Sequence, residues 1–212
     1  TTYEIDETAI ISISGVSGAD AAEDGVQSET ITLSADGDAA PTVTLATSAT
    51  TIDEDAGSSL TLTATLSNAT NEDVTVGIST SGTGTEGTDY GTISDITISA
   101  GATTGTATFT PTDDSTYEGN ETGIVAISTV SGGSANESGT PQEVTITITE
   151  NESAPTVTLS SSASSIAENA GSSLTLTATS SIVADEDITV SISTSGTGTE
   201  GTDYAAISDI TI

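Results

Sequence analysis

Apolar and polar residues alternate along most of the chain, and β-branched residues dominate the apolar positions. A period of two residues is typical of a strand with one buried face, whereas an amphipathic helix needs a period near 3.6. Residues 60–65 read Leu, Thr, Leu, Thr, Ala, Thr, and no helical stripe occurs within residues 41–154. Clusters of Gly, Asn, Asp and Ser separate the alternating segments, as expected of turns. The pattern therefore predicts an all-β protein.

Residues 41–154 contain seven such segments, lettered A to G in chain order. Seven short antiparallel strands in about 110 residues favour an immunoglobulin-like β-sandwich. Tyr117 falls between strands E and F, as in a tyrosine corner, and Tyr3 is its equivalent near the start of the chain. The apolar residues of strands A to G are, in order, Val43 and Leu45; Leu60, Leu62 and Ala64; Val74, Val76 and Ile78; Ile96 and Ile98; Ala107 and Phe109; Ile124, Val125, Ala126 and Ile127; and Val144, Ile146 and Ile148.

A long internal repeat organises the chain. PTVTLATSATTIDEDAGSSLTLTAT (41–65) returns as PTVTLSSSASSIAENAGSSLTLTAT (155–179), and 155 − 41 = 114. Repeats of this length are whole domains rather than solenoid units. We therefore expect tandem sandwiches: residues 1–40 form the C-terminal part of one repeat (strands F and G), 41–154 a complete repeat, and 155–212 the N-terminal part of the next (strands A to D). Either the chain is a piece of a longer protein, or half-domains of neighbouring copies complete each other head to tail.

The net charge of the chain narrows the range of possible functions. The chain has 32 Asp and Glu residues and no Lys, Arg or His, so its formal net charge is −32. Such a polyanion does not bind nucleic acid, because contacts to phosphates need basic side chains. No apolar run is long enough to span a membrane, so we expect no membrane insertion in this segment. The mutual repulsion of the carboxylates must be relieved by solvent cations or by a bound metal.

Alternating strands bring the acidic loops to one end of the sandwich. The A–B, C–D and E–F loops and the end of strand G meet at the same pole, which carries most of the carboxylates. Convergent carboxylates without a nearby cation suit Ca²⁺, which takes six to eight oxygen ligands. Zinc and copper are disfavoured because the chain has neither His nor Cys. The alternative is a solvated acidic surface with no specific ion.

The runs TGTEGTDY (83–90) and ITISAGATTGTATFTPTDDSTYEGNET (96–122) resemble a Calx-β domain. This module recurs in tandem in long bacterial cell-surface and adhesin-like proteins. The resemblance implies a seven-stranded sandwich that binds Ca²⁺ at the acidic pole. Two departures are Ser81, where calcium-binding members often have Asp, and the run ENE (150–152) in place of consecutive aspartates.

Carried over by position, the resemblance assigns calcium ligands to the complete repeat and to its neighbours. In the GTDY motif, Asp89 and Asp203 are interpreted instead as caps of the local backbone. The expected ligands in residues 41–154 are Glu54, Asp113, Asp114, Glu118, Glu121, Glu150 and Glu152. Their expected counterparts in the other repeats are Glu4, Glu7, Asp36, Asp38 and Glu168.

Catalysis is not expected, because no His, Cys or Lys is present to serve as an activated nucleophile or base. Near-identical repeats favour a structural role: an extracellular or cell-surface filament, stalk or adhesin in which Ca²⁺ rigidifies the domain junctions. Its partners would be neighbouring repeats of the same protein, and identical chains where filaments assemble. The alternative is a recognition module that binds a receptor or glycan through its B–C loops (67–73 and 181–187), which differ more between copies than the unchanged C–D loop.

Overall fold

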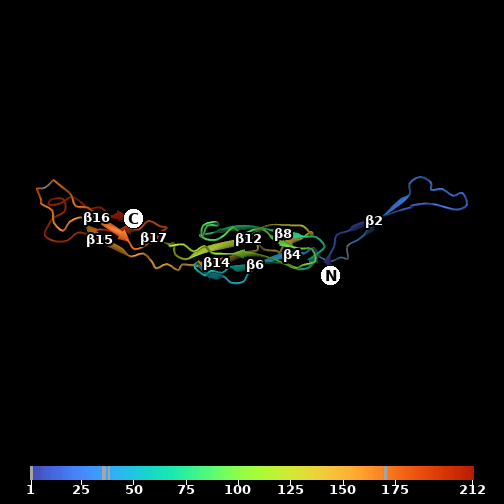
Figure 1. The fold of residues 1–212 in the computed structure, drawn as a ribbon, viewed down its shortest axis with the longest axis horizontal. Helices are drawn as coiled ribbons and strands as arrows, with labels where there is room; N and C mark the ends of the chain where they lie inside the picture. The colour runs from blue at the N-terminus through green and yellow to red at the C-terminus, as the bar shows by residue number, and fades with distance from the viewer. Residues whose placement is uncertain (1, 35–36, 38, 170) are drawn as a thin grey trace.

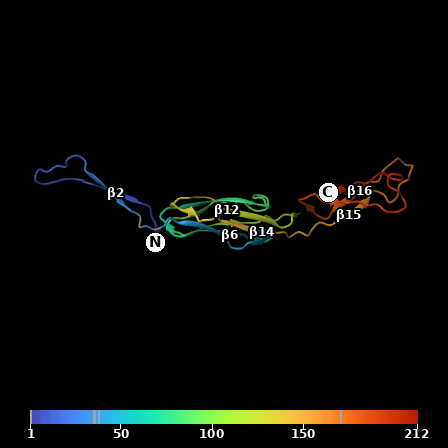
Figure 2. The same ribbon diagram turned by 180° about the vertical axis from the view of Figure 1, so that it is seen from behind.

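The chain is described by a computed structural model that covers residues 2–34, 37, 39–169 and 171–212. A compact central body is flanked by a thin hairpin toward the N-terminus and by a looser group of strands toward the C-terminus (Figure 1). The reverse view shows the same linear order (Figure 2). All regular secondary structure in the described residues is β-strand. Within them, no helix has the length and apolar character required to cross a membrane.

The central body is a sandwich of two sheets, which confirms the predicted all-β fold. One sheet has the order β10-β6-β4-β13, and the other has the order β5-β14-β12-β8-β9. Strand β12, which contains the continuous apolar run of strand F, lies in the middle of the second sheet. The strands of the two sheets are β4 (Thr42–Thr47), β5 (Thr51–Asp53), β6 (Leu60–Leu66), β8 (Val74–Gly82), β9 (Ile96–Ile98), β10 (Thr104–Phe109), β12 (Glu121–Ser131), β13 (Asn136–Glu137) and β14 (Glu143–Thr149).

The sandwich differs from the expected seven antiparallel strands. Strand A is split into β4 and β5, and β5 runs parallel to β14 in the opposite sheet. The split occurs where the amide of Ser48 still donates to Thr61 of the first sheet, while the carbonyl of Thr50 already accepts from Thr147 of the second. Short β13 adds a second parallel pair by joining β4. Both additions cover sheet edges that would otherwise present unpaired backbone groups.

Inward-facing side chains of both sheets form one core. Tyr90 and Phe109 are its largest fully buried members, and their rings stack with centroids 4.6 Å apart. Tyr90 belongs to the GTDY motif of the C–D loop, so this loop is anchored in the core by its aromatic residue. The other large, fully buried apolar side chains are Leu62, Ile96, Ile98, Ile146, Val43, Val74, Val76 and Val125.

The flanking segments repeat parts of the sandwich. The N-terminal hairpin corresponds to the β12–β14 pair but is shifted by one residue: Glu7 lies opposite Leu33, whereas Glu121 lies opposite Ile148, and 148 − 114 = 34. The C-terminal pairs β15–β16 and β18–β19 reproduce β4–β6 and β8–β9 in the same register. The flanking strands are β2 (Glu7–Ser12), β3 (Ser28–Leu33), β15 (Val157–Ser161), β16 (Leu176–Ser180), β18 (Thr189–Val190) and β19 (Ile210–Thr211).

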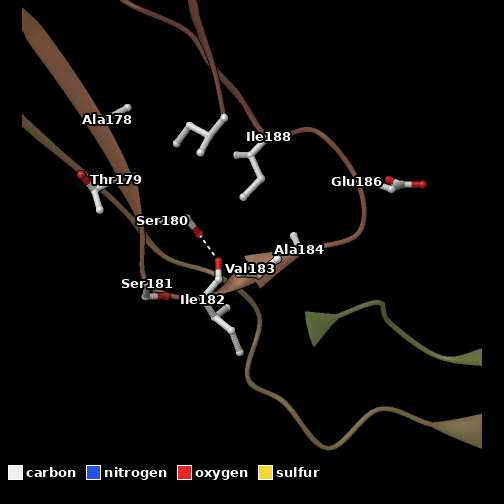
Figure 3. Close-up of a pocket in the computed structure, with 10 residues that line it drawn as sticks. Ala178, Thr179, Ser180, Ser181, Ile182, Val183, Ala184, Glu186 and Ile188 are labelled. Carbon is white, nitrogen blue, oxygen red and sulfur yellow. Dashed lines mark hydrogen bonds between the residues drawn. The ribbon is translucent and has the colours of Figure 1, made fainter. Parts of the chain in front are cut away.

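In the flanking segments, hydrophobic side chains at core positions are exposed to solvent. Every exposed large hydrophobic side chain in the described residues precedes residue 34 or follows residue 156. A hollow of about 500 Å³ lies against β16, and Ala178 and Ile188 line it (Figure 3). Their counterparts in the sandwich, Ala64 and Val74, are fully buried. The hollow therefore corresponds to positions that are part of the packed core in the central sandwich, and we do not interpret it as a ligand pocket.

Two short parallel pairings join successive repeats. Strand β1 (Thr2–Tyr3) pairs with β7 (Ala69–Thr70), and β11 (Thr116–Tyr117) pairs with β17 (Val183–Ala184). In each case a strand between E and F of one repeat meets a strand between B and C of the next. The B–C loop is thus located at the junction between repeats.

A candidate calcium site at the end of the sandwich

Strand pairing brings three carboxylates together at one pole of the sandwich. Glu54 directly follows β5, and Glu150 directly follows its parallel partner β14. The amide of Glu54 donates to the carbonyl of Thr149 over 3.0 Å, which continues the pairing by one residue. Glu152 lies two residues further along the same exit. One carboxylate oxygen from each of Glu54, Glu150 and Glu152 lies within 4.8 Å of the others.

Glu54 is the most buried carboxylate of this group, with 6% of its surface exposed. Its Oε1 accepts a hydrogen bond from the Asp114 amide at 3.4 Å. Burial raises the pKa of Glu54 to about 7, and the nearby charges of Glu150, Glu152 and Glu118 act in the same direction. A carboxylate in this position needs either a proton or a cation at neutral pH.

Glu150 has the opposite character because it is well supplied with backbone donors. Its Oε2 accepts from the amides of Glu118 and Gly119 at 2.6 and 2.8 Å, and its Oε1 accepts from the Glu152 amide at 3.0 Å. Burial alone would raise the pKa of Glu150, but these hydrogen bonds outweigh it and lower the pKa to about 2. Glu150 therefore stays ionised and fixes the position of the E–F loop.

Glu152 completes the group and leaves one oxygen without a donor. The adjacent Glu150 carboxylate, with which it can share a hydrogen bond, raises the pKa of Glu152, and desolvation adds to the effect. Within the described part of the chain, Glu152 Oε2 is buried and has no hydrogen-bond partner. An orphaned buried oxygen costs free energy unless something positively charged meets it.

A second group of carboxylates lies beside the first. Oxygens of Asp89, Glu118 and Glu121 approach within 4.8 Å of one another. Burial raises the pKa of Glu121 to about 7, and the charges of Asp89 and Glu118 add to this. Asp185, which follows β17 in the next repeat, is near enough to raise the pKa of both Glu118 and Glu121. This second group therefore faces the junction.

Asp89 also has the capping role expected from sequence. Its Oδ2 accepts the Thr85 amide at 2.6 Å, and Asp203 does the same for Thr199 at 2.7 Å. The cap holds the carboxylate at the acidic pole, so capping and membership of the second group occur together. The GTDY motif indicated the cap, and the predicted position of the C–D loop at the acidic pole indicated the second role.

The two expected aspartates of the E–F loop lie at the rim. Asp113 accepts from the Asn151 side chain at 3.2 Å, and Asp114 accepts from the Thr116 amide at 2.6 Å. Both are exposed and belong to neither close group. Their present contacts order the loop rather than complete the carboxylate groups.

The expected ligands of the flanking repeats are not gathered in the described residues. Glu4 and Glu7 are exposed beside the N-terminal hairpin, and Glu168 is exposed in a turn between β15 and β16. Asp36 and Asp38 lie outside the described residues. The groups of three carboxylates found in the described chain are thus both at the pole of the central sandwich.

The donor set at this pole fits Ca²⁺. All the converging groups are carboxylates, whose hard oxygens Ca²⁺ prefers, and no protein cation exists to compete for them. The unpartnered Glu152 Oε2 and the buried Glu54 are two places where a cation would relieve an unfavourable charge. The pole is therefore a candidate metal centre of a modular β-sandwich.

Comparison with known proteins agrees with this class. The Calx-beta domain family model matches residues 36–152 and again residues 150–210, and the chain belongs to this family. The family is of a calcium-binding β-sandwich type. A similar solved structure is a crystal structure of the apo form of a Calx CBD1 domain, with 17% identity and a TM-score of 0.44. That comparison covers 52% of this chain and 99% of the other. A search of curated proteins found no match.

Proposed function

We propose that this chain is a structural segment of an extracellular filament, stalk or adhesin, and that Ca²⁺ bound at the acidic pole rigidifies the junction to the next repeat. The observation that supports it most is the Glu54–Glu150–Glu152 group, with its orphaned Glu152 Oε2. These residues would hold the ion, and Glu118 and Glu121 would extend the site toward the next repeat. Millimolar calcium outside cells would fill even a low-affinity site of this kind.

The ion would supply the positive charge that the sequence lacks. Glu54 would lose its proton on binding, and Glu152 would no longer need to share one with Glu150. Because the folded state gathers these carboxylates and the unfolded state separates them, calcium binding stabilises the fold. No step of this role requires a nucleophile or a proton-transfer catalyst.

The recognition alternative is less well supported by the geometry. A B–C strand pairs with the preceding repeat at both junctions, so part of the loop faces a neighbour rather than solvent. A glycan or receptor would have to use the remainder of the loop. Binding of a defined sugar on a glycan array would favour this alternative over the structural role.

The central experiment measures calcium binding on the whole chain. We expect isothermal titration to show heat with Ca²⁺ and much less with Mg²⁺, and thermal melts to shift upward with millimolar Ca²⁺ relative to chelator. Glu152→Gln should weaken binding, whereas Glu143→Gln, an exposed change at the far end of β14, should not. Coincident melts with and without calcium would rule out the proposal. Labelling of intact cells with an antibody against the chain tests the location.

A further inference from the structure

The two pairings between repeats are the same contact seen twice. Strand β1 begins at Thr2 and β11 at Thr116, and 116 − 2 = 114; β7 begins at Ala69 and β17 at Val183, and 183 − 69 = 114. Both pairs are parallel and have equivalent registers. Recurrence at the repeat offset indicates a built-in joint rather than an accidental touch between neighbouring loops.

The strand between B and C is here called the docking strand (β7 and β17), and in the central sandwich β7 is held firmly by its own repeat. Thr70 is fully buried, its Oγ1 donates to the carbonyl of Glu72 at 2.6 Å, and its carbonyl accepts from Gly101 at 2.7 Å. Gly133 leaves room for it, since a Cβ there would lie 2.6 Å from Thr70 Cγ2. A strand fixed in this way loses little conformational entropy when it pairs with a neighbour.

The strand between E and F is here called the receiving strand (β1 and β11), and acidic residues hold β11 at both ends. Before β11, the Asp114 carboxylate accepts from the Thr116 amide. After it, the Glu150 carboxylate accepts from the amides of Glu118 and Gly119. The carbonyl of Tyr117 in between accepts the amide of Asp185 from the next repeat at 3.1 Å. The candidate calcium site and the joint therefore share one short segment.

The contact is made through main-chain atoms, and this explains why the docking strand differs between copies. It reads Ala-Thr in β7 and Val-Ala in β17, yet both pair in the same register. Main-chain pairing of this type tolerates changes of side chain, as in other cases of strand addition. Variation of the B–C loop is therefore compatible with a constant joint.

We propose that each repeat docks its B–C strand, by parallel main-chain pairing, onto the E–F strand of the preceding repeat, so that the partner of this surface is another copy of the repeat. The joint fixes the angle between successive sandwiches. Its calcium dependence rests on the proposed function: in calcium-free protein Asp185 adds negative charge beside Glu118 and Glu121, and this repulsion opposes docking.

A proline substitution separates the joint from the metal site. Asp185→Pro removes the backbone N–H that donates to the Tyr117 carbonyl, while Asp185→Asn keeps this N–H and removes only the side-chain charge. Asn is the residue at the equivalent position of the first junction, Asn71. Glu186→Pro is a matched control, because it places proline one residue further along the same exposed loop.

Distances between spin labels report the joint directly. The chain has no Cys, so single cysteines at the exposed strand positions Thr108 and Thr177 label the central sandwich and the following repeat. With calcium, we expect a narrow distance distribution for the unsubstituted chain, Asp185→Asn and Glu186→Pro, and loss of that narrow peak in Asp185→Pro. A broad distribution in the unsubstituted chain, or a narrow one in Asp185→Pro, would overturn the joint.

Calcium titration of the same proteins distinguishes this failure from failure of the proposed function. Asp185→Pro should still bind calcium, because the carboxylates of the central sandwich remain in place, and its affinity relative to Asp185→Asn measures the coupling between the joint and the site. If no variant binds calcium but the label distances behave as expected, the joint stands and the calcium role fails. If calcium binds normally but the distances do not respond to Asp185→Pro, the joint fails alone.

Discussion

The rings of Tyr90 and Phe109 stack with centroids 4.6 Å apart and an interplanar angle of 24°, and Gly123 of β12 lies directly beneath Phe109. Phe109 is the single Phe of the chain, and no Trp is present. This pair links the C–D loop, which supplies Asp89, to the end of β10, which leads into the acidic E–F loop. The only aromatic stack of the described residues thus supports the pole that carries the carboxylates.

Gly123→Ala should destabilise the central sandwich. A Cβ at this position would lie 2.6 Å from Phe109 Cε2, so the stacked rings would have to move. Overpacking of this kind costs about 1–3 kcal/mol of unfolding free energy. Gly91→Ala is the control, because its Cβ would have only an ordinary contact, 3.9 Å from the Thr110 carbonyl. Urea denaturation followed by circular dichroism measures both; equal midpoints would contradict the packing argument.

Removal of one buried charge should stabilise the calcium-free protein at pH 8. Glu54→Gln keeps an acceptor for the Asp114 amide and removes a carboxylate whose pKa is raised to about 7 by burial. We expect the calcium-free melting temperature to rise and the calcium-induced shift to shrink. The exposed change Glu143→Gln should alter neither quantity. A lower melting temperature for Glu54→Gln in chelator would show that the charge of Glu54 does not destabilise the calcium-free fold.

Stability of the calcium-free chain should pass through a maximum in mildly acidic solution. Glu54 and Glu121 have pKa values raised from 4.5 to about 7, so their protonated forms favour the fold. This contribution is complete below pH 4.5 and is lost as pH rises through 7. Glu150 has a pKa lowered to about 2, so its contribution is present above pH 4.5 and is lost as pH falls toward 2. Thermal melts from pH 3 to 8 in chelator test the expected order.

Thermal melts with calcium should show that the stabilisation by calcium increases toward the upper end of the pH range. Calcium binding requires deprotonated carboxylates, so calcium affinity should decrease as the pH is lowered and Glu54 and Glu121 take up protons. The stabilisation by calcium should therefore be large at pH 8 and small at pH 5. A calcium effect that does not vary across this range would place the ion away from these two residues.

The fold was predictable because strand B and strand F carry unambiguous patterns. Leu62 and Ala64 alternate with threonines, and the continuous apolar run at 124–127 is typical of a central strand, which is the position of β12 in its sheet. The switch of strand A between sheets was not predictable, since residues 48–50 are small and carry no alternating pattern. They are held by hydrogen bonds to both sheets, from Ser48 to Thr61 and from Thr147 to the Thr50 carbonyl. Strands β7 and β11, two residues each, are too short to show a period.

The sequence predicted the location of the site at one pole of the sandwich, but it did not predict which carboxylates come together there. Alternation of strands places the acidic loops together, yet it does not say which oxygens approach each other. Glu54 and Glu150 meet because β5 and β14 are parallel, a pairing that depends on the unpredicted sheet switch. Asp113 and Asp114 match the sequence motif equally well but lie at the rim. Side-chain distances of this kind depend on tertiary contacts that no local pattern contains.

The two roles of Asp89 can be separated by two substitutions. Asp89→Asn keeps an oxygen that accepts the Thr85 amide, whereas Asp89→Ala removes it. Loss of this hydrogen bond should lower the unfolding free energy by about 1 kcal/mol in the Ala variant only. If Asp89 also contributes to the second carboxylate group, both variants should weaken calcium binding, measured by titration calorimetry. Unchanged affinity in Asp89→Asn would leave Asp89 as a backbone cap and confine the ion to Glu54, Glu150 and Glu152.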